Sequence, residues 1–449
     1  MKTINRRNFI KASALAGAGL TLAPGLAFRC TGQNSGKPVL LGGRKPSYSF
    51  SKWPIYDQTE EQALLEVLNS SHWGRLSGTV TKKFEEEYAK INGTAHALAV
   101  SSGTSALFTM LGALDVGPGD EVVLPVYTFV ASYNVVGLNY ALPILVDTNI
   151  DTFQVDTKKM EQAITPQTKL LMPVHIGGAP ADLDAMMEMG KKHNLPVIED
   201  ACQAHLAEWK GQKVGSFGLG GAFSFQASKN LNCAEGGAIT SNDQEFIERC
   251  YIFHNQGQGG RGASYGTGSG TRGSNLRLTE FQAALLLAQM TRLEEQMQIR
   301  SANGDYLTEL FNEIPGITPA KVHEGTTRNA YHLYMFRFDS THFDGLTRDE
   351  FIKALTAEGV PCSPGYGQMN SSEYVRGLAE NKHYLKVYGE KTMKEWLERN
   401  HCPQNDKLTK EQAVWFTQPM LLGDRSDMDK IAEAVRRIQK YATELNDSR

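Results

Sequence analysis

Short apolar runs alternate along the chain with longer segments in which apolar residues recur every three or four positions. The short runs are typical of buried strands, and the longer periodic segments are typical of amphipathic helices. The runs that we interpret as strands are 121–126, 170–175, 197–200, 222–225 and 238–240. Strands that alternate with helices predict an α/β fold with a mostly parallel sheet flanked by helices. Ligands bind such sheets beyond the carboxyl ends of the strands, so residues that follow each run are the first candidates for a site.

The pattern changes at about residue 301, where the regular alternation of strand and helix ends. A strand is predicted over 334–338, and helices are predicted over 348–358 and 427–445. We therefore expect a large domain over residues 49–300 and a smaller C-terminal α+β domain over residues 301–449.

A long amphipathic helix is predicted at the end of the large domain, over residues 278–300. Core packing is sufficient to explain its apolar face, which consists of Leu286, Met290, Leu293 and Met297. The stretch before it, 257–273, is rich in glycine and contains too few apolar residues to build a core. It predicts a mobile surface loop.

The N-terminus resembles a twin-arginine export signal over residues 1–27. Arg6 and Arg7 precede a short apolar stretch, 12–22, which is followed by small residues. The alternative is a chance arginine pair on an N-terminal helix. The apolar stretch is shorter than the roughly 20 residues that a transmembrane helix needs. A functional signal implies passage through the Tat translocase to the periplasm or beyond, without stable membrane insertion; otherwise the protein is cytoplasmic.

Residues 28–48 are rich in glycine, proline, serine and lysine and show no apolar periodicity, which indicates a tether between the signal and the folded part. Cys30 stands where a lipid-attachment cysteine can stand, but the arginine directly before it disfavours that interpretation.

The overall composition indicates a globular protein that acts on a small molecule. With 449 residues and 41% hydrophobic content, the chain can bury a large core. The formal net charge is only -3, and no basic stripe is present, which argues against binding nucleic acid or an anionic membrane. The six cysteines lack the close pairing of a zinc site and the density of a disulfide scaffold, so no metal site is expected.

A candidate phosphate cradle follows the apolar residues 97–100. Residues 101–105 read Ser-Ser-Gly-Thr-Ser and open a helix-like segment, 106–114. Gly103 allows close backbone approach, hydroxyls such as that of Thr104 donate, and a helix N-terminus favours an anion. The simpler alternative is that these residues only cap the helix.

Three further residues can serve one heterocyclic cofactor. Asp200 ends a buried run, where an acid can keep a pyridinium nitrogen protonated. Lys229 lies just beyond another run, among hydroxyls and amides, where an amine can form a Schiff base. Phe129 can stack on a ring. Taken singly, each has an ordinary alternative: a helix cap for Asp200, a surface charge for Lys229 and a core position for Phe129.

The order and spacing of these residues resemble the DegT/StrS family of sugar aminotransferases. The resemblance extends from about residue 53 to residue 440. The stretches that carry it are Ser102-Gly103-Thr104, Tyr127-Thr128-Phe129, residues 175–183, Glu199-Asp200, residues 224–237, Asn275-Leu276-Arg277 and Gln282-Ala283-Ala284.

This resemblance implies the fold-type I aminotransferase fold and the cofactor pyridoxal 5'-phosphate (PLP). Lys229 matches the Schiff-base lysine, and Asp200 matches the carboxylate that faces the pyridine nitrogen. The other implied cofactor contacts are Gln203 near the phenolic oxygen, Phe129 stacked on the ring, and Gly103, Thr104 and Ser224 at the phosphate. Asn275 matches an asparagine that reaches the phosphate from the neighbouring subunit, which implies a homodimer.

A finer resemblance, which includes Gly365-Tyr366, points to the branch that aminates keto-cyclitols such as scyllo-inosose with glutamine. We therefore expect amino transfer from glutamate or glutamine to a keto-sugar or keto-cyclitol, with His332, Tyr334 and Tyr366 as candidate substrate contacts. Some family members have histidine in place of the lysine and are dehydratases, whereas this chain keeps Lys229, which favours amino transfer. Elimination or dehydration at a sugar carbon with the same cofactor is the alternative. A non-catalytic exported sugar-binding protein on the same fold is another.

Overall fold

The computed structural model describes residues 36–259, 268–270 and 272–448. The signal sequence expected over residues 1–27 and Cys30 lie outside the described residues, as does much of the glycine-rich stretch 257–273. In the part of the chain that is described, no helix combines the length and the apolar content needed to cross a membrane.

The large sheet has the strand order β3-β2-β4-β5-β8-β9-β1. Hydrogen-bonded ladders join β3, β2 and β4 in one half of the sheet and β5, β8, β9 and β1 in the other. Parallel bridges such as Val174–Asp200 connect the two halves between β4 and β5. β9 runs antiparallel to both of its neighbours, β8 and β1. The strands are β1 (His96–Val100), β2 (Glu121–Pro125), β3 (Leu142–Val146), β4 (Thr168–Leu171), β5 (Ile198–Asp200), β8 (Gly220–Ser224) and β9 (Gly237–Ser241). The expected mostly parallel sheet is confirmed.

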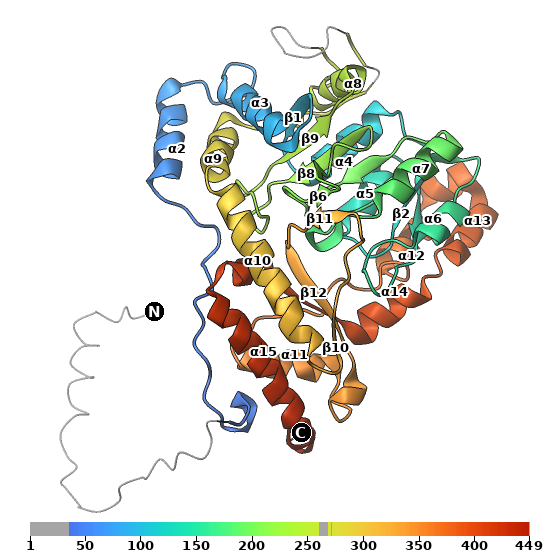
Figure 1. The fold of residues 1–449 in the computed structure, drawn as a ribbon. Coiled ribbons are helices and arrows are strands. Elements are labelled where there is room, and N and C mark those ends of the chain that lie inside the picture. The colour runs from blue at the N-terminus through green and yellow to red at the C-terminus, as the bar shows by residue number, and fades with distance from the viewer. Residues whose placement is uncertain (1–35, 260–267, 271, 449) are drawn as a thin grey trace, which may run out of the picture.

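Helices cover both faces of this sheet (Figure 1). On β1, Leu98 and Val100 pack into the core beneath one helical layer, whereas Ala97 and Ala99 pack into the core on the other face. This alternation follows from the two-residue period of a strand. The helices of the large sheet are α3 (Val80–Asn92), α4 (Gly103–Ala113), α5 (Ala131–Leu138), α6 (Thr157–Gln162), α7 (Leu183–His193), α8 (Gln244–His254) and α9 (Glu280–Met290).

A second core surrounds an antiparallel sheet of order β10-β12-β13. The strands are β10 (Ile317–Pro319), β12 (Leu333–Phe338) and β13 (Ala413–Thr417). The main helices of this second lobe are α10 (Leu293–Asn312), α11 (Arg348–Ala357), α15 (Arg425–Lys440) and α16 (Ala442–Asp447). A third, small sheet pairs β6 (Glu208–Trp209) with β7 (Gln212–Lys213) and β11 (Thr326–Arg328).

Two features of the C-terminal third differ from a simple division at residue 300. Helix α10 runs through that position, so one continuous helix belongs to both lobes. Helices α12 (Glu373–Glu380) and α13 (Lys382–Arg399) pack on the core of the large sheet, where the indole Nε1 of Trp396 donates to the carbonyl of Pro143 at 2.9 Å. Short helices α2 (Gln58–Ser70) and α14 (Pro403–Lys407) complete the chain.

The single helix expected over residues 278–300 is two helices, α9 and α10. The break falls at Thr291 and Arg292. The guanidinium of Arg292 forms salt bridges with Glu60 and with Asp57, the latter at 2.9 Å. The chain therefore interrupts the helix where Arg292 binds the N-terminus of α2, a contact that the apolar periodicity does not encode.

The described part of the expected tether lies against the second lobe (Figure 1). The backbone N–H of Val39 donates to Glu358 at 2.7 Å, and the backbone N–H and Oγ of Ser49 donate to one carboxylate oxygen of Asp427 at 2.9 and 2.6 Å. Leu41, Tyr48 and Phe50 pack on the second core. Side-chain hydrogen bonds and single apolar contacts hold this segment, and neither produces a periodic sequence pattern.

Candidate active site

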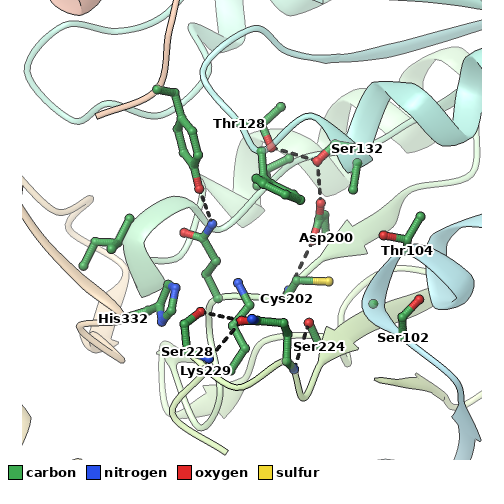
Figure 2. A pocket seen from close by; sticks show the side chains of 18 of the residues that line it. Ser102, Thr104, Thr128, Ser132, Asp200, Cys202, Ser224, Ser228, Lys229 and His332 are labelled. Carbon is green, nitrogen blue, oxygen red and sulfur yellow. Dashed lines mark hydrogen bonds between the residues drawn. The ribbon is translucent and has the colours of Figure 1, made fainter. Parts of the chain in front are cut away.

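A cavity of about 640 Å³ opens at the carboxyl ends of β5 and β8, where the first lobe meets the second. In the view of Figure 2, Ser102 and Thr104 lie on one side of it and His332 lies on the opposite side, with Asp200 and Lys229 between them. These residues come from segments that are far apart in the sequence, and the sheet topology brings their side chains to one edge.

Lys229 follows β8 on a tight turn in which its backbone N–H donates to the carbonyl of Gln226 at 2.8 Å. Its side chain lines the cavity. Burial lowers the pKa of the ammonium group, and the nearby Cys202 and Asp200 only partly oppose this effect. Among the described residues, no side chain or carbonyl accepts a hydrogen bond from Nζ. A partly buried amine with a lowered pKa and no fixed partner is suited to act as a nucleophile and proton carrier.

Asp200 ends β5 and is 5% exposed. One carboxylate oxygen accepts from Ser132 Oγ at 2.7 Å, and the other accepts from the backbone N–H of Cys202 at 3.2 Å. Ser132 in turn contacts the hydroxyl of Thr128 at 2.8 Å. These donors fix the carboxylate at the cavity wall.

The neighbouring residue, Glu199, braces the strand from its opposite face. Its carboxylate accepts from His175 Nε2 at 3.0 Å and from the backbone N–H groups of Gly215, Phe217 and Gly218 at 2.7 to 3.0 Å. Complete burial opposes ionisation, but the hydrogen bonds outweigh it and hold the pKa of Glu199 below its usual value. Glu199 therefore anchors the strand that positions Asp200.

The candidate phosphate cradle lies at the N-terminus of α4. Ser102 caps the helix, with its Oγ accepting from the N–H of Ser105 at 3.0 Å, so the capping interpretation is correct for this residue. Gly103, Thr104 and Ser224 line the cavity beside it. A Cβ on Gly103 would stand 2.6 Å from the Cβ of Ser224, so only glycine allows this close approach. Backbone N–H groups and hydroxyls thus face the same space, an arrangement that binds anions.

The other expected ring and substrate contacts divide between the cavity and the core. Gln203, Phe129, His332 and Tyr366 line the cavity, and the side chain of Phe129 is 55% exposed. Tyr334 does not line it. Its hydroxyl lies 3.0 Å from that of Thr308 in the second core.

The direction of Tyr334 has a simple reason. Side chains alternate along β12, and its neighbour Leu333 faces the cavity. The structure therefore does not support Tyr334 as a substrate contact.

Asn275 also lies outside the cavity. It is exposed, and its backbone pairs with that of Asn255 before α9. It does not line the cavity that contains Lys229 and Asp200 in its own subunit, which agrees with the expectation that it serves the neighbouring subunit.

Several residues of the cavity did not follow from the sequence. Trp53 reaches it from the N-terminal segment, where its indole Nε1 donates to the carbonyl of Ala227 in the Lys229 turn at 2.9 Å. Ser132 supports Asp200, and Trp415 forms part of the wall beside Tyr366. Two signals were available: Ser132 lies three residues beyond Phe129, and Trp415 belongs to the stretch 414–416, which also resembles the keto-cyclitol branch.

Comparison with known proteins identifies the family. The sequence model of the DegT/DnrJ/EryC1/StrS aminotransferase family matches residues 54–414. This chain belongs to that family. The expected α/β fold and the expected aminotransferase class are therefore confirmed. A model of twin-arginine translocation pathway signal sequences matches residues 3–23.

Two curated relatives of this aminotransferase cover nearly its whole folded part. The L-glutamine:2-deoxy-scyllo-inosose aminotransferase of Streptoalloteichus tenebrarius is 37% identical over 88% of this chain and 96% of its own length. The L-glutamine:scyllo-inosose aminotransferase of Streptomyces griseus is 33% identical over 91% of this chain and 99% of its own length.

Solved structures agree with this assignment. The crystal structure of 3-amino-5-hydroxybenzoic acid synthase superposes on the aminotransferase with a TM-score of 0.77 at 31% identity, covering 88% of this chain and 99% of the synthase. DesV from S. venezuelae gives a TM-score of 0.73, also at 31% identity, over 86% of this chain and 94% of its own.

Proposed function

We propose that this aminotransferase binds PLP through Lys229 and transfers an amino group from glutamine or glutamate to the ketone of a keto-cyclitol or keto-sugar. The observation that carries the proposal is the single cavity around which Lys229, Asp200 and the anion cradle converge. The relatives are named as enzymes that transfer an amino group from L-glutamine to inososes, which supports the choice of substrates.

The residues present fit PLP. The cradle of Gly103, Thr104 and Ser224 offers donors for a phosphate, Asp200 offers a fixed carboxylate for a pyridine nitrogen, and Phe129 presents an exposed ring face. Bound PLP supplies an electron sink for charge that develops at the α-carbon of the amino donor.

The protein groups have distinct tasks in this scheme. The Asp200 carboxylate would keep the ring nitrogen protonated, and the hydrogen bond from Ser132 holds the carboxylate in position. The Lys229 amine would hold the cofactor, and when it is free it would take a proton from the α-carbon of the amino donor and supply one to the carbon of the keto acceptor. Phe129 would restrain the ring plane. The cradle would hold the cofactor by its phosphate whenever Lys229 is not bonded to the cofactor.

A homodimer completes the proposed site. Asn275 is exposed and outside the cavity of its own subunit, which leaves its side chain available to a neighbouring subunit. We infer that the Asn275 side chain of one subunit contacts the cofactor phosphate in the other. Lys229 is present in place of the histidine found in dehydratases, which favours amino transfer over elimination or simple sugar binding.

Lys229→Ala tests the assignment. The wild type should show the visible absorbance band of a lysine-bound cofactor and convert glutamine or glutamate to its oxo-acid. The variant should lose the band and slow amino transfer by about 100- to 10,000-fold, because no amine remains to carry the proton. Lys210→Ala, which removes an exposed lysine paired with Asp184, should leave both unchanged. A variant at position 229 that retained the band and the activity would refute the assignment.

We further propose that the enzyme is exported by the Tat translocase and acts in the periplasm. This pathway transports folded proteins, so the cofactor can be bound before export. Arg6→Lys combined with Arg7→Lys should retain the protein in the cytoplasm when cell fractions are compared by immunoblot. Equal periplasmic amounts of the wild type and the variant would contradict export by this route.

A further inference from the structure

Two side chains of the cavity, Tyr366 and His332, each form a hydrogen bond with a side-chain amide whose orientation is fixed. Gln203 accepts a hydrogen bond from the backbone N–H of Gly177 through Oε1 at 2.8 Å, so its Nε2 must face the other way. That nitrogen donates to the hydroxyl oxygen of Tyr366 at 2.7 Å. The orientation of the amide is therefore set by the backbone and not by the tyrosine.

Tyr366 consequently has an unused proton. Its hydroxyl oxygen accepts from Gln203, and no acceptor among the described residues takes the O–H proton. Burial raises the pKa of Tyr366 well above its usual value, so the proton stays on the oxygen. The ring is held edge to face against Trp415, with 4.7 Å between centroids, and against Tyr127, at 5.4 Å. The hydroxyl is thus a fixed hydrogen-bond donor at the cavity.

His332 is the complementary case. The Nδ2 of Asn230 donates to the carbonyl of Ala330 at 2.8 Å, which leaves Asn230 Oδ1 facing His332 Nδ1 at 3.2 Å. An oxygen can only accept, so Nδ1 carries the proton and Nε2 has a free lone pair. Burial, followed by the charge of Lys229, holds the pKa of His332 far below its usual value, so the ring remains neutral. His332 also lines the cavity.

We propose that Tyr366 and His332 form a donor–acceptor pair that binds hydroxyl groups of a polyhydroxylated keto acceptor. The inference rests on the proposed function and specifies what its acceptor must carry. A hydroxyl group both donates and accepts hydrogen bonds, so it satisfies a fixed O–H and a fixed lone pair together. The carboxylate of the amino donor can only accept hydrogen bonds, so it cannot form one with the lone pair of His332 Nε2.

The rest of the wall agrees with an uncharged polyol. The charged side chains among the lining residues are Asp200, Lys229 and Glu235, of which the first two serve the cofactor. Trp53, Phe129 and Trp415 supply aromatic surface, against which the C–H faces of a cyclitol ring can pack.

The test uses three variants of the holoenzyme. Tyr366→Phe removes the hydroxyl group, which includes the O–H donor and the oxygen that accepts from Gln203. His332→Asn keeps a donor for Asn230 but has no atom at the Nε2 position, and His332→Gln can restore an acceptor there. Tyr334→Phe is the matched control, because it removes a hydroxyl that is bound in the core. The acceptors are scyllo-inosose and 2-deoxy-scyllo-inosose, and non-reacting scyllo-inositol is titrated by calorimetry.

Tyr366→Phe and His332→Asn should lower kcat/KM for scyllo-inosose by about 10- to 100-fold and weaken scyllo-inositol binding to a similar degree. At least one of them should also change the preference between the two inososes. The rate of the donor half-reaction should stay within about threefold of wild type, and His332→Gln should regain part of the loss. Tyr334→Phe should match the wild type.

The inference is overturned if Tyr366→Phe leaves both scyllo-inositol binding and acceptor kcat/KM unchanged, or if the donor half-reaction falls equally. If His332→Asn does not fold, Tyr366→Phe alone decides. If the wild type lacks the donor half-reaction, the proposed function is refuted instead. The role of the Tyr366–His332 pair is then still tested by comparing scyllo-inositol binding to the wild type and to Tyr366→Phe.

Discussion

Asp200 illustrates how single contacts set the chemistry of a side chain. Its carboxylate receives one hydrogen bond from Ser132 and one from the backbone of Cys202, and its backbone pairs with Pro173 and His175 at 2.9 and 3.0 Å. The position of the charge is therefore determined by neighbours from three segments. A carboxylate prepared in this way does not have to reorganise when a pyridine nitrogen approaches.

At this scale we predict graded effects of two substitutions. Asp200→Asn should slow the donor half-reaction by about 100- to 1,000-fold, because the uncharged amide no longer stabilises a protonated ring nitrogen. Ser132→Ala removes one hydrogen bond to the charged group and should slow it by about tenfold. Single-turnover absorbance measurements with glutamine check both. If Ser132→Ala slowed the reaction as much as Asp200→Asn, the supporting role of Ser132 would be disproved.

Among the elements, the segment from residue 36 to α2 contributes more than its sequence indicates. It crosses the second lobe, where Ser49 binds Asp427, and it ends with Trp53 bound to the Lys229 turn. Asp427 is completely buried, and without Ser49 its carboxylate would retain Lys430 but lose two donors. The segment therefore links the stability of the second lobe to the geometry of the cavity.

Two truncations test this role. Removal of residues 1–35 should leave the melting temperature unchanged. Removal of residues 1–56 should lower it by about 5 °C or more, because Tyr48 and Phe50 leave the second core and Asp427 loses two hydrogen bonds. The comparison is made by differential scanning calorimetry on both proteins. Equal melting temperatures would show that the segment is a tether after all.

Across the whole molecule, burial of neutral histidines ties stability to pH. Burial lowers the pKa of His205 and of His254 to about 3, and it lowers that of His332 far below the usual value. Unfolded histidine titrates near 6.5. The unfolded chain therefore binds protons below about pH 6.5 that the folded protein does not bind, and folding stability falls as the pH decreases from there toward 3.

We predict that the free energy of unfolding, measured in urea, is nearly constant above about pH 7 and falls by up to about 4 kcal/mol per pH unit between pH 6 and 4. His254→Asn should reduce that slope by about one third, since one of the three proton-binding sites is lost. Substitution of the exposed His401 by Asn is the control and should not change the slope. A slope of equal steepness in the His254 variant would contradict the explanation.

Local patterns were sufficient for β2, β4, β5, β8 and β9 and for the polar residues at the strand ends, but they did not predict β3 or the break between α9 and α10. Apolar runs become buried strands whichever neighbours they acquire, and the ends of parallel strands meet at one edge. Asp200, Lys229 and Gly103 could be predicted to converge for this reason, and the family resemblance added Gln203, Ser224 and Phe129, which also line the cavity.

Contacts between distant segments were decided only by the tertiary structure. The break between α9 and α10 coincides with the salt bridges of Arg292, and Asp200 accepts a hydrogen bond from Ser132. The bonds of Tyr366 and His332 to amides of the first lobe join residues more than 100 positions apart. Hydrophobic periodicity specifies which face of an element is buried. It carries no information on which polar group lies opposite, because that depends on how whole elements pack.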